Sequence, residues 1–526
     1  MLMLNKFLSF IQAFIFSLLL AFSVVILWLN LQYATLTDLV TFKERVTVVP
    51  RGIVLTLLVS LALLSAAAVL YKVFTGLSRR IIFLILALSV PLSLGIGIIL
   101  ARNNPYPPNY DQRIVWEMAG YLTGYNNNIT YSYIPNYWIK YPQQKTIAVI
   151  LSWFIRLTRS GSPYYFRLFN ALAFALYVSG SFILTRRLWN NDAAALLAAV
   201  MTASFLPMYF YVNYVYSTVA VMTAVLWAFI CFIMSQDKED VLHSILLPGA
   251  GSILLFFSNT FYEATLIATV AAILYLILCA AKRRLSLSKK RLAGMALAAA
   301  VIIFLPVPVK TFADREFETR IEVEPNDGFP MTSWILMGIQ TEEGVNGPGS
   351  YDDSTDFIFA DHNYNTEETA ADINRRIRET VREYLRGERS LTFFRDKTII
   401  QWCDPWFSSA TMTFFPGLID EKDQNPFYAS LISGGALKTE EKVYSFVIPF
   451  IALGAAAAAF LLLVRPELSP GAALPAMYFI GGFIFQLFWE SKSRYCLPYF
   501  LILIPFAAFG ASELPALIRR IRSAKR

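Results

Sequence analysis

Long apolar stretches alternate with short polar or charged segments along most of the 526 residues. Twelve of these stretches approach the roughly 20 residues that cross a bilayer as a helix. They lie at about 8–31, 52–71, 81–101, 164–184, 193–210, 216–234, 243–257, 262–281, 292–309, 443–464, 471–488 and 495–512. The pattern therefore predicts an all-α polytopic membrane protein with about twelve transmembrane helices.

Two shorter segments have the pattern of helices that lie on a membrane surface. After the turn-rich sequence NNPYPPN, apolar residues recur at helical spacing at Val115, Met118, Ala119 and Leu122. The segment 145–159 is also apolar on one side, but it is too short between its charges to span a bilayer. Both are predicted to be interfacial helices in an outer loop, residues 102–163.

Residues 310–442 differ in composition from the rest of the chain. They hold 25 acidic and 14 basic residues, although the whole chain carries a formal charge of +8. We interpret this segment as a folded extracytoplasmic insert, α/β or irregular, with an amphipathic helix near 367–385. Lys397, Trp402 and Asp404 are interpreted as part of a charged face on that insert.

The basic residues elsewhere set a topology. Six of them fall between Lys282 and Arg291 with no acid among them, and other basic groups flank apolar stretches on the same side. This positive-inside pattern places both termini in the cytoplasm and the insert outside. It also accounts for the positive charge without nucleic acid. The four cysteines and two histidines show no metal-ligand spacing.

Asp111 stands where the first interfacial helix begins. A carboxylate held just outside the bilayer can take a proton from a sugar or lipid hydroxyl, as a general base. Asp is also a favoured N-cap residue, and a helix is predicted from the next residue on. The two roles are compatible, because a capping carboxylate has a fixed position.

A second candidate group lies between the last two predicted spans. Lys492 and Arg494 suit a lipid phosphate, Arg through two parallel hydrogen bonds and Lys as a point charge. A local ion pair with Glu490, together with snorkelling from the helix ends, is the structural alternative.

Five further residues at outer positions are weaker candidates for substrate binding. Arg102 and Lys310 lie at outer ends of predicted spans, where snorkelling also explains a basic residue. Tyr211, Asn213 and Glu263 lie at the predicted tips of two outer hairpins, where loop polarity explains them equally well.

This arrangement resembles the GT-C class of integral membrane glycosyltransferases, which includes protein O-mannosyltransferases and the lipid A aminoarabinose transferase. Three features carry the resemblance: an acid early in an outer loop, here Asp111-Gln112; many hydrophobic hairpins; and an aromatic and basic outer junction, here WESKSRYCLPYF. The resemblance implies a division into two extra N-terminal helices (1–80), a GT-C-like module (81–309), the insert (310–442) and a C-terminal part (443–526).

The resemblance also implies a function. Asp111 would be the general base of an inverting transfer from a polyprenyl-phosphate sugar, and Lys492 and Arg494 would bind the donor phosphate. The acceptor would be a glycan, lipid or protein on the outer face of a bacterial plasma membrane, among membrane lipids. Several relatives have two adjacent acids where this chain has Asp111-Gln112, so a requirement for a divalent cation stays open.

Two other classes of function remain. A flippase or transporter of lipid-linked sugars needs polar or ionisable groups within spans, and Arg167, Asn170 and Gln486 are among the few present. A non-catalytic envelope assembly protein needs none of the candidate sites.

Overall fold

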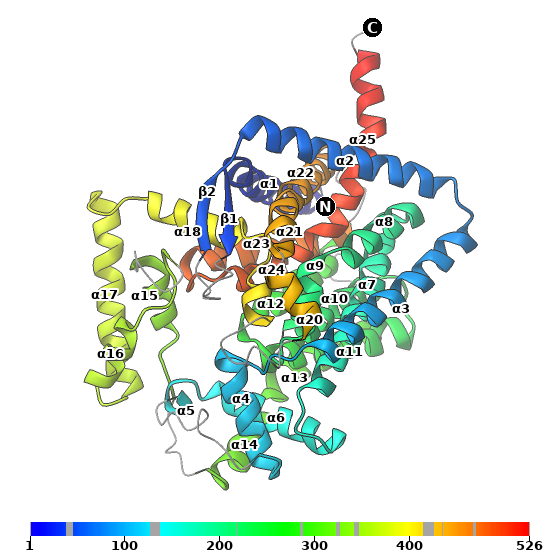
Figure 1. Ribbon diagram of the computed structural model, residues 1–526. Helices are drawn as coiled ribbons and strands as arrows, with labels where there is room; N and C mark the ends of the chain where they lie inside the picture. The colour runs from blue at the N-terminus through cyan, green and yellow to red at the C-terminus, as the bar shows by residue number, and fades with distance from the viewer. Residues whose placement is uncertain are drawn as a thin grey trace.

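The computed structural model describes residues 2–37, 46–126, 137–216, 218–283, 288–321, 327–340, 347–413, 425–433, 435–465 and 470–524. The elements, shown in Figure 1, are α1 (Leu2–Gln32), β1 (Tyr33–Thr37), β2 (Val46–Pro50), α2 (Ile53–Thr75), α3 (Arg79–Asn103), α4 (Tyr110–Thr123), α5 (Tyr137–Lys140), α6 (Gln143–Thr158), α7 (Tyr164–Trp189), α8 (Asp192–Ala203), α9 (Leu206–Tyr211), α10 (Thr218–Met234), the π-helical turn η1 (Leu242–Leu246), α11 (Leu247–Phe261), the 3-10 turn η2 (Glu263–Thr265), α12 (Leu266–Lys282), α13 (Lys289–Phe304), α14 (Pro306–Glu318), α15 (Thr332–Gln340), α16 (Ser354–Asp361), α17 (Thr366–Arg386), α18 (Thr392–Trp402), α19 (Ser409–Thr413), α20 (Pro426–Ser433), α21 (Ala436–Tyr444), α22 (Val447–Val464), η6 (Pro470–Ala472), α23 (Ala473–Phe488), α24 (Ser493–Leu501) and α25 (Leu503–Ala524).

The expected multi-pass helical class is confirmed. Within the described residues, nine helices are long and apolar enough to cross a membrane. The bent pair α24–α25 makes a tenth if it counts as one span, and α8 and α10 are shorter apolar helices. The predicted twelve spans correspond to this set only when the bent pair and both short helices are included.

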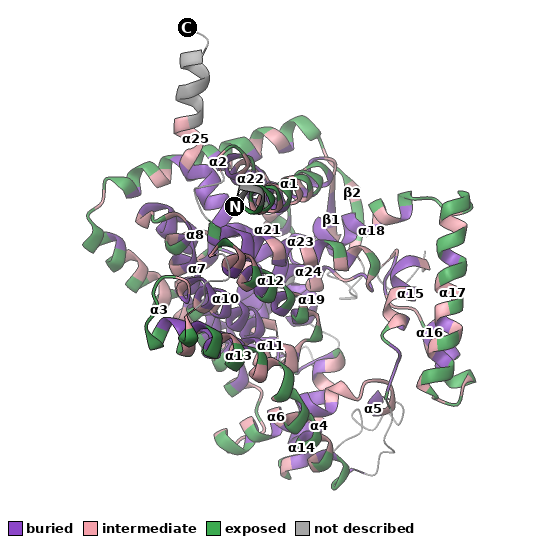
Figure 2. Ribbon diagram, turned by 180° about the vertical axis from the view of Figure 1, so that it is seen from behind, coloured by how far each residue is buried: buried purple, intermediate pink, exposed green. Residues whose placement is uncertain are grey.

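Large apolar side chains cover the outer faces of several of these helices. On α3, for example, Leu88, Leu92 and Ile99 are each more than half exposed, and Figure 2 shows exposed residues along the outer helices around a buried centre. Continuous apolar surface of this kind is unfavourable in water and favourable against lipid chains.

The centre of the bundle is packed through small residues. α22 contacts both α1 and α25, while α7 contacts α3, α8 and α10. A Cβ atom on Gly510 would lie 2.1 Å from the carbonyl oxygen of Gly454, so the backbones of α25 and α22 touch there. Glycine permits this close crossing of membrane helices, in which dispersion contacts replace the hydrophobic effect.

The predicted fifth span, 193–210, is broken into α8 and α9. Pro207 lies in the first turn of α9, where its ring cannot continue a preceding helix. Tyr444 on α21 stabilises the break, because its hydroxyl contacts the Ser204 carbonyl and accepts a hydrogen bond from the Leu206 amide at 2.9 Å.

The two helices predicted to be interfacial, α4 and α6, form as the spacing predicts. α4 packs on α6, and the apolar positions of α4, from Val115 to Leu122, are buried in that contact. α14 packs on the other side of α6.

A two-stranded antiparallel hairpin joins α1 to α2 and pairs Tyr33 with Pro50. Its strand β1 is attached to the insert, because the Thr35 amide and hydroxyl both donate to the Cys403 carbonyl, at 3.4 and 3.2 Å. The Thr37 amide donates to Glu441 Oε1 at 2.6 Å. The first two helices are therefore tied to residues some 400 positions later.

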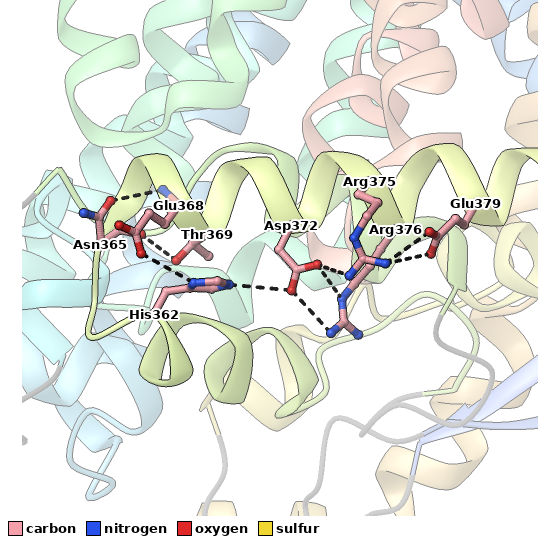
Figure 3. A network of polar contacts seen from close by, with 8 residues as sticks. All are labelled: His362, Asn365, Glu368, Thr369, Asp372, Arg375, Arg376 and Glu379. Carbon is pink, nitrogen blue, oxygen red and sulfur yellow. Dashed lines mark hydrogen bonds and ion pairs between the residues drawn. The ribbon is translucent and has the colours of Figure 1, made fainter.

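The described part of the insert consists of helices and irregular connections. It contains α15 to α21, and α17 covers the predicted amphipathic helix. Figure 3 shows that α16 and α17 are linked through His362, which lies 3.7 Å from both Glu368 and Asp372. Asp372 also pairs with Arg375 and Arg376 on the same helix.

Candidate functional site

A cavity of 1230 Å³ lies where the interfacial helices, the insert and the ends of several spans meet. Its walls come from α4, α5 and α6, from the junctions α11–η2–α12 and α13–α14, from the insert, and from residues 485–498. Segments predicted to lie outside the membrane, although distant in sequence, thus share one cavity.

Asp111 lines this cavity and does not cap α4. The helix begins at Tyr110 with Asn109 in the N-cap position, so Asp111 lies inside the first turn. This corrects the expectation that Asp111 would be the N-cap. A carboxylate in the first turn is stabilised by the helix dipole, and that of Asp111 remains 42% exposed. The Asp111 carboxylate therefore lines the cavity from inside the first turn of α4.

Two side chains approach the Asp111 carboxylate. The Tyr137 hydroxyl donates to Oδ1 at 3.4 Å, and Arg494 Nη2 lies 3.9 Å from Oδ2. Burial, with a contribution from the Asp111 charge, raises the pKa of the Tyr137 phenol well above its ordinary value. Tyr137 is therefore a hydrogen-bond donor at every physiological pH and orients the carboxylate.

The residue after Asp111 fixes the start of α4. Gln112 is 2% exposed, and its side-chain amide donates to the Met412 carbonyl at 3.1 Å while its oxygen accepts from the Val215 amide at 2.9 Å. Asn109 donates to the Thr411 carbonyl at 3.2 Å. Because a carboxylate could not donate to Met412, a glutamine suits this position better than a second acid.

The predicted basic group lines the same cavity. Arg494 is largely buried; its Nη1 lies 3.1 Å from the Met412 sulfur, and its guanidinium lies over the Tyr495 ring. Lys492 Nζ lies 3.4 Å from Glu490 Oε1, so the predicted local ion pair is present as well. Glu490 is itself 3% exposed and accepts a 3.4 Å hydrogen bond from the Tyr495 hydroxyl.

The weaker candidates divide into two groups. Lys310 and Glu263 line the cavity. Arg102 is exposed in the last turn of α3, and neither it nor Tyr211 or Asn213 is among the described residues that line the cavity. Tyr211 and Asn213 are buried rather than at an exposed loop tip, and the Tyr211 hydroxyl donates to the Phe407 carbonyl. They do lie in the connection between two apolar helices, as expected, but the Tyr211 hydroxyl is engaged by the segment after α18.

Lys397, Trp402 and Asp404 are not part of a charged face, since all three are completely buried. Lys397 Nζ donates to the carbonyls of Gly338, Leu487 and Trp489, at 2.6, 3.0 and 2.6 Å. Asp404 accepts from the Ser493 hydroxyl at 2.6 Å and from the amides of residues 406 and 408. These residues join the insert to the ends of α23 and α24.

The polar residues within the spans have structural partners. Arg167 donates to the Asn104 carbonyl at 3.0 Å and also to that of Tyr106. Asn170 donates to the carbonyls of Val212 and Tyr214, at 3.2 and 2.8 Å. Both therefore hold loops at the ends of neighbouring helices.

Several cavity residues were not singled out from the sequence. Besides Tyr137, they include an ion pair between Lys140 and Asp356, and Tyr351, whose hydroxyl donates to Asp356 at 2.9 Å. The many aromatic residues of the predicted outer loop were the sequence feature that could have indicated these cavity residues. Aromatic residues are, however, also typical of segments in the headgroup layer of a membrane.

No group of three or more His, Cys, Asp and Glu side chains suited to a metal ion occurs among the described residues. Comparison with known proteins adds nothing to this geometry: no protein-family model matches the chain, and no curated protein matches it.

Proposed function

We propose that this protein is a membrane glycosyltransferase of the GT-C type, which moves a sugar from a polyprenyl-phosphate donor to an acceptor hydroxyl. The observation that carries the proposal is the proximity of Asp111 and Arg494, 3.9 Å apart, in a cavity with an apolar side. A base and a phosphate-binding cation in one cavity can serve the two ends of one displacement reaction, provided that they move apart from their present ion-pair distance when the acceptor and the sugar bind between them.

The cationic side supports departure of the lipid phosphate. Charge grows on the bridging phosphate oxygen as its bond to the sugar breaks, and preorganised cations stabilise that charge most where water is excluded. Arg494 is held by Met412 and Tyr495, so its guanidinium is oriented before the donor arrives. Lys492 and Lys310 add positive charge on the same cavity.

The apolar side supports binding of the donor's lipid chain. Leu266 and Ile267 of α12, and Ile302 and Val307 at the α13–α14 junction, line the cavity. These two groups of apolar residues belong to different pairs of packed helices, because α12 packs on α23 whereas α13 packs on α11. Leu266 and Val307 are at least half exposed, so an isoprenoid chain from the bilayer can lie against both.

The proposed chemistry needs one base and no covalent intermediate. The acceptor oxygen forms a bond to the anomeric carbon and gives its proton to Asp111. The bond between that carbon and the phosphate oxygen breaks with its electron pair, leaving polyprenyl phosphate. Attack opposite the leaving group inverts the anomeric configuration.

The test is a deletion strain complemented with variants, followed by mass spectrometry of its envelope glycopolymers, lipids and glycoproteins. Wild type should restore a mass increment of one glycosyl unit, and Asp111→Asn should not, although it is expected to fold because Asp111 caps no helix. Loss of general-base help lowers rates by about 100- to 10,000-fold. Glu117→Gln on the same helix is the matched control and should complement.

Two outcomes would contradict the enzymatic proposal. Complementation by Asp111→Asn with normal product levels would favour an assembly protein without catalysis. Transbilayer movement of a lipid-linked sugar in liposomes by both wild type and Asp111→Asn would favour the flippase.

A further inference from the structure

The insert forms the wall of the cavity that faces α23, and aromatic rings line it. Trp489 lies between Phe485 and Trp334. Its ring centroid is 4.7 Å from that of Phe485, with the ring planes 27° apart. It is 5.9 Å from that of Trp334, with the ring planes 11° apart. Phe485 belongs to α23 and Trp334 to α15, so the stack joins a span to the insert. All three rings are only partly buried and line the cavity.

Polar groups flank this stack. The Asp356 carboxylate forms an ion pair with Lys140 and accepts a hydrogen bond from the Tyr351 hydroxyl, both through Oδ2. Its other oxygen, Oδ1, is buried and takes no hydrogen bond from the part of the protein that the structure describes. A buried acceptor without a partner is destabilising, so a ligand that donates a hydrogen bond to Oδ1 would be favoured.

From this combination we infer that the insert wall is a carbohydrate subsite, and that the acceptor is a sugar chain with neutral rings. The inference rests on the proposed function. The C–H face of a sugar ring is apolar and carries partial positive charge, which the negative face of an indole attracts. The ring's hydroxyls would meet Asp356 and Tyr351.

The charges on this wall disfavour an anionic acceptor. Asp327 and Asp356 are both present, and Lys140 is already paired with Asp356. A phosphate or carboxylate on the acceptor would face these acids, whereas the donor phosphate would face Arg494 and Lys492. The two substrates are thus distinguished by charge.

A row of aromatic rings connects this wall to the base. Tyr141 lies between them, with its ring centroid 6.2 Å from that of Trp334 and 5.0 Å from that of Tyr137. Tyr137 in turn contacts Asp111. A sugar chain stacked on Trp334 can therefore extend along these rings towards the Asp111 carboxylate.

The experiment is saturation-transfer-difference NMR on the purified full-length protein in detergent. The probes are neutral trisaccharides built from glucose, mannose, galactose and N-acetylglucosamine, with glucose 6-phosphate and a Ser/Thr-rich peptide as comparison ligands. We expect saturation transfer to the C–H protons of at least one trisaccharide, with the signal lost in Trp334→Ala and largely retained in Trp334→Phe.

Tyr351→Phe should weaken the same binding without affecting the stack, which keeps the test valid if Trp334→Ala fails to fold. Arg102→Ala should bind the trisaccharide normally, because Arg102 is exposed on α3 and is not among the described residues that line the cavity. Absence of binding to every trisaccharide, binding insensitive to Trp334 and Tyr351, or preference for the phosphate or peptide probe would each overturn the inference. The role of Asp111 is judged separately by complementation.

Discussion

At the scale of single residues, the position of Asp111 is set mainly by the residues next to it in sequence, Asn109 and Gln112, and less by the contacts of its own side chain. Asn109 takes the N-cap position and Gln112 is bonded to the segments around Met412 and Val215. The Asp111 carboxylate, one residue before Gln112, contacts Tyr137 and Arg494. The sequence singled out Asp111 and Arg494 because charged residues beside apolar spans are conspicuous. It did not reveal the role of Gln112, which depends on contacts with residues more than 100 positions away.

Gln112→Glu should damage the site rather than create a metal-binding pair. Glutamate cannot donate to the Met412 carbonyl, and it places a charge where the side chain is 2% exposed. A lost buried hydrogen bond costs about 1–3 kcal/mol, and more when a charge is involved. We expect a lower thermal midpoint and lower transfer activity, unchanged by EDTA or Mg²⁺. Activity that rises with Mg²⁺ in this variant alone would contradict the structural role.

Arg494→Ala should impair use of the donor. Hydrogen bonds to charged groups contribute about 1.5–3 kcal/mol, so kcat/KM for the lipid donor should fall by about 10- to 100-fold. Arg494→Lys should recover part of this loss, since lysine supplies the charge but not the bidentate contact. Normal donor kinetics in Arg494→Ala, at normal expression, would remove this residue from the phosphate site.

At the scale of secondary-structure elements, helices α4, α6 and α17 follow from local spacing, whereas the insert's attachment does not. Lys397 on α18 supplies three donors to carbonyls of α15 and of the C-terminal end of α23. A Cβ on Gly338 would lie 2.2 Å from the Phe488 carbonyl oxygen, so α15 touches the backbone of α23 there. The charge of Lys397 suggested a surface position, because sequence alone cannot tell which lysine will meet three carbonyls.

The stability of this attachment should depend on pH. Burial lowers the pKa of Lys397 to about 7, although Cys496 and Glu490 act in the opposite direction. Between that value and 10.5, the ordinary pKa of a lysine side chain, the unfolded chain binds more protons than the folded one, so stability rises with pH over this window. Below pH 7 both states carry the proton, and the contribution is constant.

Lys397→Met tests this linkage. It removes the titrating group and leaves three carbonyls without a donor, so it should be less stable than wild type at every pH. The difference in unfolding free energy should widen by about 1–3 kcal/mol from pH 7 to pH 9. Thermal midpoints measured in detergent at several pH values provide the comparison. Parallel profiles for the two proteins would show that Lys397 does not titrate in this range.

At the scale of the whole molecule, the hydrophobic pattern predicted the class, most spans and the grouping of the outer loops. It did not predict the break between α8 and α9, which depends on Pro207 and on Tyr444 from a distant helix. The hydrophobic pattern also did not reveal that the insert forms one wall of the cavity. Trp334 and Trp489 are far apart in sequence and come into contact only when the insert packs on α23.

The predicted orientation can be checked by cysteine labelling. Lys238 lies in an exposed turn after α10 and Glu388 in an exposed turn after α17. In a background with the native cysteines replaced, an impermeant maleimide applied to intact cells should label Glu388→Cys at once and Lys238→Cys only after permeabilisation. Labelling of both, or the reverse order, would contradict the positive-inside topology.

The hairpin between α1 and α2 has a consequence for how the protein can be divided. Since β1 is bonded to Cys403 and Glu441, and α1 packs along α22, residues 1–80 are not a removable extension. Truncation there should yield an aggregating product, whereas 1–76 and 77–526 expressed as separate polypeptides should assemble in the membrane and co-purify. A two-chain form of this kind would allow isotope or fluorophore labels to be placed in one segment alone.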